Sequence, residues 1–306
     1  METKIIVFAK QVPDTHNISG KAMKDDGTVN RAALPAIFNP EDLNALEMAL
    51  QIKDSFGAHV TVITMGPPRA ADILRESLFR GADRTVLITD RAFAGADTLA
   101  TSYSLAQAVK RLGADLVLCG RQAIDGDTAQ VGPQAAEKLH FNQVTFAEEV
   151  LALDPKKKKI TIRRTLGRST ETIETALPVL ITVPAANEPR SFGAKFQMKF
   201  KKARTKIEIE EAVKNSTPGG NYAEDWVNSE VSRQCDELRS KGLLIDTWSA
   251  ADLNADPESI GLPGSPTKVK KIESVILAAR ETKTVEAKEA GIRQFMKELI
   301  EEKTFV

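Results

Sequence analysis

The chain has 306 residues, 42% of them hydrophobic, and its 42 lysine and arginine residues balance its 42 aspartate and glutamate residues. A chain of this length and composition can bury a sizeable core, either as one large domain with an appendage or as two domains. Because the charges balance and aromatic residues make up only 5% of the chain, we expect no nucleic-acid partner.

Cysteine, histidine and apolar residues set further limits. The two cysteines cannot form a disulfide framework or a cysteine-rich metal site, and the three histidines lie far apart without HExxH spacing. The first residues lead directly into an apolar strand, and no run approaches the roughly 18 apolar residues that a membrane helix needs. We therefore expect a soluble, cytoplasmic protein without a membrane span.

Residues 4–9 begin the chain with β-branched and aromatic side chains, a pattern typical of a buried strand. Residues 10–14 follow as a polar loop. Residues 15–38 form a long excursion without a period, in which a small hairpin is expected around residues 25–27. A helix then begins at Asn39, which suits an N-cap, with Pro40 at the first helical position and acids in the first turn.

Strands and helices alternate from here to residue 139. Strands are predicted at residues 60–65, 84–89 and 116–118, each followed by a helix. This alternation predicts an α/β fold with a doubly wound, mostly parallel, Rossmann-like sheet and right-handed crossovers. The loops after Ala9, Met65, Asp90 and Gly120 should meet at one edge of the sheet, where ligands bind in this fold class.

Past residue 140 the hydrophobic period changes. Residues 144–153, 160–166 and 170–177 are predicted as strands of hairpins added to the sheet, and residues 179–183 as a buried strand. The charged segment at residues 216–260 is expected to be a surface insertion. The last helix, residues 284–303, carries apolar residues that fit docking on another chain or on its own sheet.

The most informative stretch is ADLVLCGRQAIDGDTAQVGPQAAEKL at residues 114–139. An apolar strand ends at Gly120, a polar loop follows, and Thr128 stands where the N-cap of the next helix is expected. Gly126 lets the backbone approach a ligand, and the free N–H groups of a helix start attract phosphate. No lysine follows the glycines as in a P-loop, so phosphoryl transfer is not expected. The alternative is a plain turn whose polar residues only cap a helix.

The string GRQAIDGDTAQVGP at residues 120–133 resembles the nucleotide-binding signature of the electron transfer flavoprotein beta subunit, most closely that of the bifurcating, FAD-binding branch. The KQVPD string at residues 10–14 and the segment that starts at Asn39 are similar to their counterparts in that family. The resemblance covers most of the chain and is weakest in the charged insertion. It implies a fold like that of the adenine nucleotide alpha hydrolases, with a C-terminal arm.

The resemblance places a nucleotide, FAD in the bifurcating branch, along the loops at the sheet edge. Asp125 is assigned to the ribose or adenine end, because a carboxylate suits hydroxyl groups and repels phosphate. NADH would meet the flavin at a rim near Gly66, where Thr98 and Thr101 either bond the flavin ring or cap a helix. The implied cofactor-binding residues are Phe8, Ala9, Asn39, Pro40, Asp42, Met65, Gly66, Asp97, Thr98, Thr101, Gly120, Arg121, Gln122, Ala123, Ile124, Asp125, Gly126, Asp127, Thr128, Ala129, Gln130 and Val131.

The same resemblance implies redox work with partners rather than a self-sufficient enzyme. The chain would form a heterodimer with an electron transfer flavoprotein alpha subunit. Electrons would pass to ferredoxin and, through an alpha-subunit flavin, to an acyl-CoA dehydrogenase-type flavoenzyme. Two alternatives stay open, an electron carrier with structural AMP in place of FAD and a nucleotide-sensing binding module.

Four parts of the chain follow from this reading. Residues 1–190 would form the nucleotide- and flavin-binding domain with its hairpins, and residues 191–215 the partner recognition loop and a basic segment. Residues 216–260 would form the charged insertion, and residues 261–306 the C-terminal arm and helix that contact the alpha subunit. Phe192 and Phe196 lie in the recognition loop, where they either anchor a partner or pack on their own domain.

Overall fold

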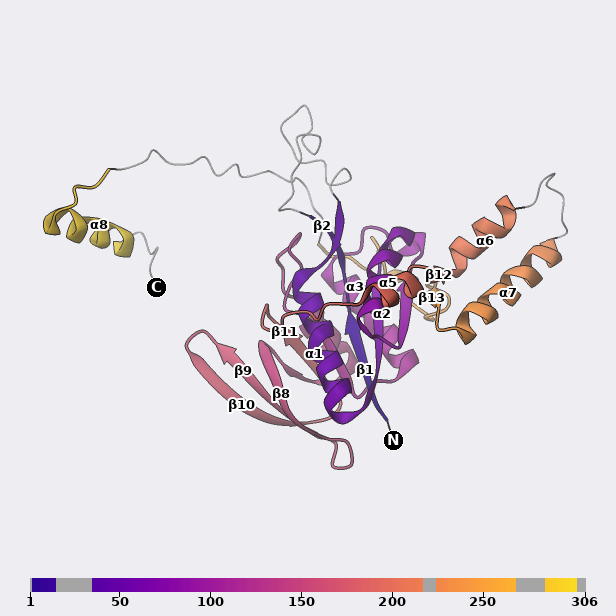
Figure 1. The fold of residues 1–306 in the computed structure, drawn as a ribbon, viewed down its shortest axis with the longest axis horizontal. Coiled ribbons are helices and arrows are strands. Elements are labelled where there is room, and N and C mark those ends of the chain that lie inside the picture. Colours follow the sequence, from indigo (N-terminus) through magenta and orange to yellow (C-terminus); the bar gives the residue numbers. More distant parts are fainter. Residues whose placement is uncertain (1, 15–34, 217–223, 268–283, 302–306) are drawn as a thin grey trace.

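The computed structural model describes residues 2–14, 35–216, 224–267 and 284–301. An eight-stranded sheet, parallel throughout, has the strand order β12-β13-β5-β4-β1-β6-β11-β7. It lies at the centre of the fold, around β1 (Figure 1). The predicted α/β fold with a doubly wound, mostly parallel sheet is therefore confirmed. The strands are β1 (Thr3–Phe8), β4 (Ala58–Met65), β5 (Arg84–Ile88), β6 (Leu116–Gly120), β7 (Asn142–Val144), β11 (Val179–Val183), β12 (Arg204–Thr205) and β13 (Leu244–Trp248).

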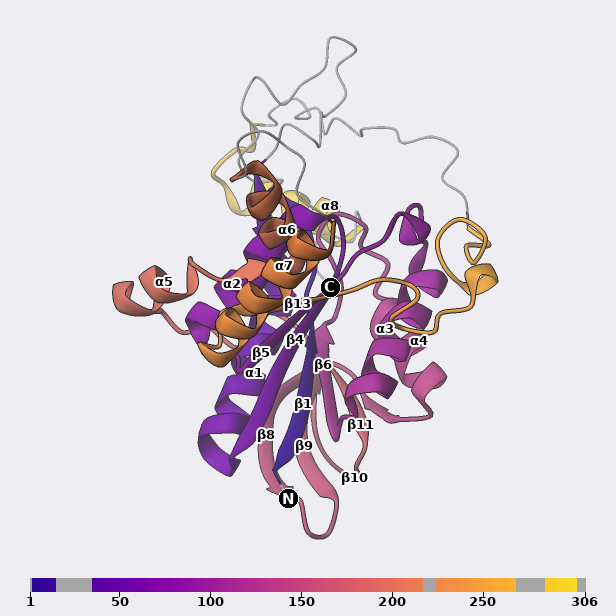
Figure 2. The ribbon, with the colours of Figure 1, turned by 90° about the vertical axis from the view of Figure 1, so that its right-hand side faces the viewer.

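The strand β1 lies inside this sheet because its side chains are apolar on both faces. Ile5 and Val7 belong to one buried cluster, whereas Ile6 and Phe8 belong to another. Successive side chains of a strand point to opposite faces, so an unbroken apolar run needs cover on both. Two pairs of helices on opposite sides of the sheet provide it (Figure 2). They are α1 (Pro40–Phe56) and α2 (Ala71–Arg80) on one side, and α3 (Thr98–Leu112) and α4 (Val131–Leu139) on the other.

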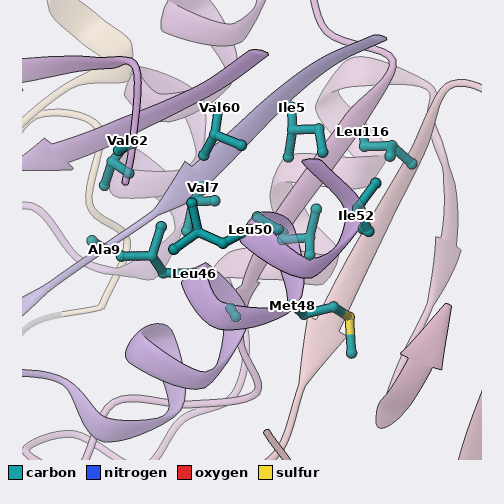
Figure 3. Packing of buried hydrophobic residues seen from close by; sticks show 14 of the residues in the cluster. Ile5, Val7, Ala9, Leu46, Met48, Leu50, Ile52, Val60, Val62 and Leu116 are labelled. Carbon is teal, nitrogen blue, oxygen red and sulfur yellow. The ribbon is translucent and has the colours of Figure 1, made fainter. Parts of the chain in front are cut away.

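Helix α1 fixes the edge of the sheet at which the candidate site lies. Its side chains Leu46 and Leu50 lie beside Val7 of β1 in the buried cluster (Figure 3). Full burial of each such side chain stabilises the fold by about 1.5–3 kcal/mol. Because α1 runs back along β1, this packing brings the first residues of the helix to the carboxyl ends of the strands.

The direction of the crossovers reverses between β1 and β6. From β1 the chain passes through α1 to β4 and through α2 to β5, and after α3 it returns to β6 on the other side of β1. Such a reversal opens a crevice beyond the carboxyl ends of the two strands, and ligands of open α/β sheets bind there. The loop at residues 121–130 leaves β6 at this point of reversal.

Three antiparallel strands form a small sheet of their own, so the expectation that they extend the central sheet is wrong. They pair in the order β10-β9-β8, and Ile160 and Ile162 of β9 belong to the same buried cluster as α1. A single strand at residues 144–153 does not form either, because Phe146 has a φ of 59° and interrupts it. The strands are β8 (Ala147–Asp154), β9 (Lys159–Leu166) and β10 (Ser169–Ala176).

A two-stranded ribbon lies in the segment between β1 and α1. The loop expected at residues 10–14 contains β2 (Gln11–Pro13), which pairs antiparallel with β3 (Ala36–Phe38). The hairpin expected around residues 25–27 lies outside the described residues. Short 3-10 turns, η3 (Pro68–Ala70), η4 (Arg91–Phe93) and η5 (Pro257–Ser259), complete the connections.

The segment at residues 216–260 was expected to be a surface insertion, but its strand β13 (Leu244–Trp248) belongs to the central sheet. Helices α6 (Lys206–Asn215) and α7 (Glu224–Ser240) pack on each other through a small apolar cluster, and β13 then pairs with β5. Trp248 at the end of β13 is 7% exposed and belongs to the core. In contrast, helix α8 (Glu289–Glu301) has no buried residue.

Candidate functional site

The outer half of the loop after β6 carries backbone donors without partners. Residues 126–130 are exposed, and no acceptor among the described residues meets the N–H groups of Thr128, Ala129 and Gln130. The backbone is left-handed at Ala129, with a φ of 52°, and right-handed at Gln130, with a φ of −105°. Alternation of this kind turns successive N–H groups to one side and forms a concavity that binds anions. This half of the loop can therefore hold a phosphate.

The expectation that Thr128 caps the next helix is wrong. Helix α4 begins at Val131, and Gln130 occupies the N-cap position without a side-chain cap hydrogen bond. The reason is the positive φ of Asp127 and Ala129, 49° and 52°, because left-handed residues cannot belong to an α-helix of L-amino acids. Thr128 instead lies in the exposed loop that leads into the helix.

The inner half of the same loop is fixed by the first residues of α1. Asp42 Oδ1 accepts the N–H of Gly120 at 2.8 Å, and Glu41 Oε2 accepts the N–H of Gln122 at 2.9 Å. Asn39 Oδ1 accepts the N–H of Ile124 at 3.1 Å, and its Nδ2 donates to the carbonyl of Gln122 at 2.9 Å. Asn39 makes no side-chain cap hydrogen bond to α1, although Pro40 does occupy the start of the helix as expected.

The carboxyl group of Asp42 is buried beneath the loop. Its second oxygen accepts the N–H of Lys10 at 2.9 Å. Burial raises the pKa of Asp42 to about 7, although the N–H donors of Gly120 and Lys10 oppose the shift. Burial, with the nearby charge of Asp42, also raises the pKa of the Cys119 thiol, so this cysteine is an inert part of the core.

An ion pair joins the loop after β1 to the loop after β6. Lys10 Nζ lies 2.7 Å from Asp125 Oδ1, with the lysine side chain 49% exposed and the aspartate side chain 19% exposed. Gln122 Nε2 also donates to Asp127 Oδ1 at 3.1 Å. The bond from Gln122 to Asp127 connects the inner half of the loop, which α1 fixes, to the exposed outer half.

The start of α3 reaches the same loop. Thr98 Oγ1 donates to Gln130 Oε1 at 2.8 Å, so two predicted site residues 32 positions apart meet directly. Asp97 instead serves structure, because one of its oxygens caps α3 by accepting from Leu99 and Ala100, and the other accepts the N–H of Thr267 at 3.0 Å. Partial burial raises the pKa of Asp97, but the N–H donors lower it by more, so the pKa lies below its usual range.

The remaining predicted residues lie on the strands and at the rim. Phe8 and Ala9 are 4% and 7% exposed, so only their backbone is available to a ligand. Met65 ends β4 at the carboxyl edge, and Gly66 follows it, with its N–H bonded to Ile88 of β5. The side chain of Thr101 is partly buried in the first turns of α3.

Two residues that contact the loop, Lys10 and Glu41, are absent from the cofactor-binding residues that the resemblance implies. Glu41 looked like a partner of the helix dipole, yet its carboxylate binds Gln122 N–H and lies 2.8 Å from Arg121 Nη2. The signal that could have identified it is a pair of adjacent acids directly after Asn39 and Pro40, at a helix start that faces the end of a buried strand.

The two phenylalanines of the predicted recognition loop differ in their environment. Phe192 packs on its own domain, with its ring centroid 5.5 Å from that of Phe79 and the guanidinium of Arg80 at 5.1 Å. Phe196 lies on α5 (Ala194–Phe200) and is 56% exposed, and Met198 on the same helix is 72% exposed. Of the two predicted anchors, only Phe196 is therefore an exposed side chain.

The described residues do not offer some other kinds of site. No group of three or more histidine, cysteine or acidic side chains that could hold a metal ion occurs within residues 2–14, 35–216, 224–267 and 284–301. Within the same ranges, no helix combines the length and the apolar composition needed to cross a bilayer.

The residues of the loop fit a phosphate-bearing nucleotide. The N–H groups of residues 128–130 face no protein acceptor, and the Nε of Arg121 is buried without a partner in the part of the chain that the structure describes. At Gly126, nothing lies within 4 Å of the place that a Cβ would take. Unpaired donors and open backbone are what an oxygen-rich ligand needs.

The fold and the loop after β6 together define the class of protein to which this chain belongs. A doubly wound sheet with an anion-binding loop at its reversal point is the layout of a nucleotide-binding α/β protein. Residues 26–214 match the family model described as the electron transfer flavoprotein domain. The chain belongs to the electron transfer flavoprotein family, and its named relatives include beta subunits.

Three relatives illustrate this membership. The electron transfer flavoprotein subunit beta of Clostridium acetobutylicum is 42% identical over 268 residues, covering 87% of this chain and 86% of the relative. The caffeyl-CoA reductase-Etf complex subunit CarD of Acetobacterium woodii is 50% identical over 269 residues, covering 87% and 86%. Protein FixA of Rhizobium meliloti is 35% identical over 302 residues, covering 97% and 89%.

Proposed function

We propose that this chain is the beta subunit of a bifurcating electron transfer flavoprotein and holds FAD along residues 120–131. The observation that carries the proposal is the exposed run of unpaired N–H groups at Thr128, Ala129 and Gln130, which would bind the pyrophosphate. The open space beside Gly126 supports the same placement, because the backbone there can lie against a ligand.

Other residues of the site would orient the nucleotide. Asp125 would accept a ribose hydroxyl, since Lys10 bonds to only one of its two oxygens. Thr98, tied to Gln130, would place the start of α3 beside the loop. NADH would approach along this rim, which Met65, Gly66 and Thr101 complete.

Bound FAD would supply the redox chemistry, accepting a hydride from NADH and dividing the electrons between ferredoxin and an alpha-subunit flavin that serves an acyl-CoA dehydrogenase-type flavoenzyme. The likeness of residues 120–133 to the bifurcating branch supports this assignment, as does the 50% identity to a subunit of a caffeyl-CoA reductase-Etf complex. The protein lining described above contributes binding and orientation, and the cofactor contributes the reaction. We place this work in the cytoplasm.

The partner surfaces follow from exposed apolar side chains. Helix α8 exposes Ile292, Phe295, Met296 and Ile300, so we propose that it docks on the alpha subunit in a heterodimer. The exposed Phe196 and Met198 of α5 would contact the acyl-CoA dehydrogenase-type flavoenzyme. Apolar anchors of this kind carry most of the binding energy at protein interfaces.

The cofactor is tested by counting what the heterodimer releases. We expect two FAD molecules for each purified and denatured heterodimer, measured by absorbance and chromatography against protein concentration. One FAD and one AMP would overturn the bifurcating assignment and leave an electron carrier with structural AMP. Adenine nucleotide without any flavin would instead favour a nucleotide-sensing module.

The placement of the phosphates is tested by Thr128→Glu. A carboxylate beside the N–H groups of residues 128–130 would repel phosphate by about 1–4 kcal/mol, so nucleotide affinity should fall by roughly fivefold to nearly a thousandfold. Thr172→Glu on the exposed face of β10 is a matched control and should retain the nucleotide. Equal nucleotide content in the two variants would place the phosphates elsewhere.

A further inference from the structure

Three side chains of one helix start hold three alternate amides of the nucleotide loop. The N–H groups of Gly120, Gln122 and Ile124 are bound by Asp42, Glu41 and Asn39 respectively, at 2.8, 2.9 and 3.1 Å. Residues 120, 122 and 124 of the loop pair in order with residues 42, 41 and 39 of the helix start. The two segments thus run past each other in opposite directions, joined by side chain to backbone.

We propose that the side chains of Asn39, Glu41 and Asp42 are positioning groups, which fix the backbone of residues 120–124 so that the N–H groups of residues 128–130 face the ligand. This inference rests on the nucleotide site proposed above. It differs from the expectation that Asn39 and Asp42 contact the nucleotide directly.

The polar atoms of these side chains are already occupied. Asn39 is fully buried at 0% exposed, and both ends of its amide group bond to the loop. Asp42 is 7% exposed, and each of its oxygens accepts one backbone N–H. A direct bond to the nucleotide would break one of these contacts and leave a buried group unpaired.

Charge leads to the same conclusion. Two adjacent carboxylates beside a phosphate would repel it. Here Glu41 is neutralised by Arg121 at 2.8 Å, and Asp42 lies beneath the loop rather than on its exposed side. As a brace for an N–H group, however, the carboxylate of Glu41 is a strong acceptor, because hydrogen bonds to a charged group are about twice as strong as neutral ones.

The same helix offers a matched control. Glu47 is also buried, at 6% exposed, and also binds a backbone N–H and an arginine, but both belong to Arg190 at 3.0 and 2.9 Å. Glu47→Gln therefore removes a comparable charge from α1 without changing any bond to residues 120–124.

The experiment measures residue-resolved amide hydrogen exchange and AMP affinity in the purified heterodimer. We expect Asn39→Ala, Glu41→Gln and Asp42→Asn to accelerate exchange at Ile124, Gln122 and Gly120 respectively, each by about tenfold, because alanine removes the acceptor and each amide variant keeps one acceptor oxygen where the carboxylate used two. AMP affinity, measured by calorimetry after removal of the bound nucleotide, should fall by a similar factor. Glu47→Gln should change neither quantity, and unaltered exchange in β4 verifies folding.

The outcomes separate this inference from the proposed function. Faster exchange with unchanged AMP affinity would overturn the positioning role. Lower affinity with unchanged exchange would also overturn it and indicate direct contact. If Thr128→Glu alone lowers AMP affinity, the nucleotide site stands and the positioning role fails. If neither Thr128→Glu nor any of the three variants lowers it, the proposed site itself is wrong.

Discussion

Replacement of Gly120 by alanine is expected to destabilise the folded chain by about 3 kcal/mol and to abolish nucleotide retention. A Cβ at this position would lie 2.6 Å from Asp42 Oδ1, 2.8 Å from Asp42 N and 2.8 Å from the carbonyl carbon of Glu41. Two of these atoms are backbone of the first turn of α1, so rotation of a side chain cannot relieve the overlap. The helix start would have to move away from β6 and take the braces of the loop with it.

The destabilisation is measured by urea unfolding, with the nucleotide content of the folded protein determined in parallel. Gly126→Ala is the control, because nothing lies within 4 Å of its Cβ position and its unfolding midpoint should stay close to that of the unaltered chain. Equal midpoints for Gly120→Ala and Gly126→Ala would show that α1 and β6 are not in close contact.

The second large effect is the part of the pH dependence of the unfolding free energy that comes from Asp42. Its pKa rises from the ordinary value of 3.8 to about 7 in the folded chain, because burial disfavours the charge. The folded state therefore keeps a proton that the unfolded state releases. The stability that this proton provides is present below pH 3.8 and is lost as the pH rises to about 7.

The loss amounts to about 1.4 kcal/mol per pH unit, and to something on the order of 4 kcal/mol across the window. We expect the free energy of unfolding of the unaltered chain, minus that of Asp42→Asn, to decrease with this slope between pH 4 and 7, since the amide does not titrate. Urea unfolding at several pH values gives both curves. Parallel curves would contradict a raised pKa at Asp42.

The strands and helices in the first half of the chain were predictable because each element carries its own signal. β1 and β6 are continuous apolar runs, and Asn39 with Pro40 marks a helix start. The return of the chain to the sheet at β13 was not predictable. Its partner β5 is far away in the sequence, as the pairing of Asp246 with Val86 shows, and the flanking helices are highly charged.

The candidate site also has a part that was predictable from the sequence and a part that was not. The position of the loop after Gly120 follows from a buried strand that ends in glycine and from the edge that ligands use in this fold class. The bracing by Glu41 and Asp42 joins residues 81 and 78 positions apart, and no local pattern reports such a contact. The cap assigned to Thr128 failed because Asp127 and Ala129 adopt a left-handed backbone that residue type alone does not reveal.

The exposed helix α5 is tethered at both ends to one rigid sheet. It lies between β11 and β12, which both belong to the eight-stranded sheet, and Arg190 fastens the segment before it to Glu47 and Asp54 of α1 at 2.9 Å. A surface held in this way would lose little conformational entropy when the proposed flavoenzyme partner binds, so less of the binding energy of Phe196 and Met198 would be spent on ordering α5. Release of this tether by Arg190→Ala should thus weaken partner binding through the entropy of the free subunit, even though Arg190 lies outside the exposed helix.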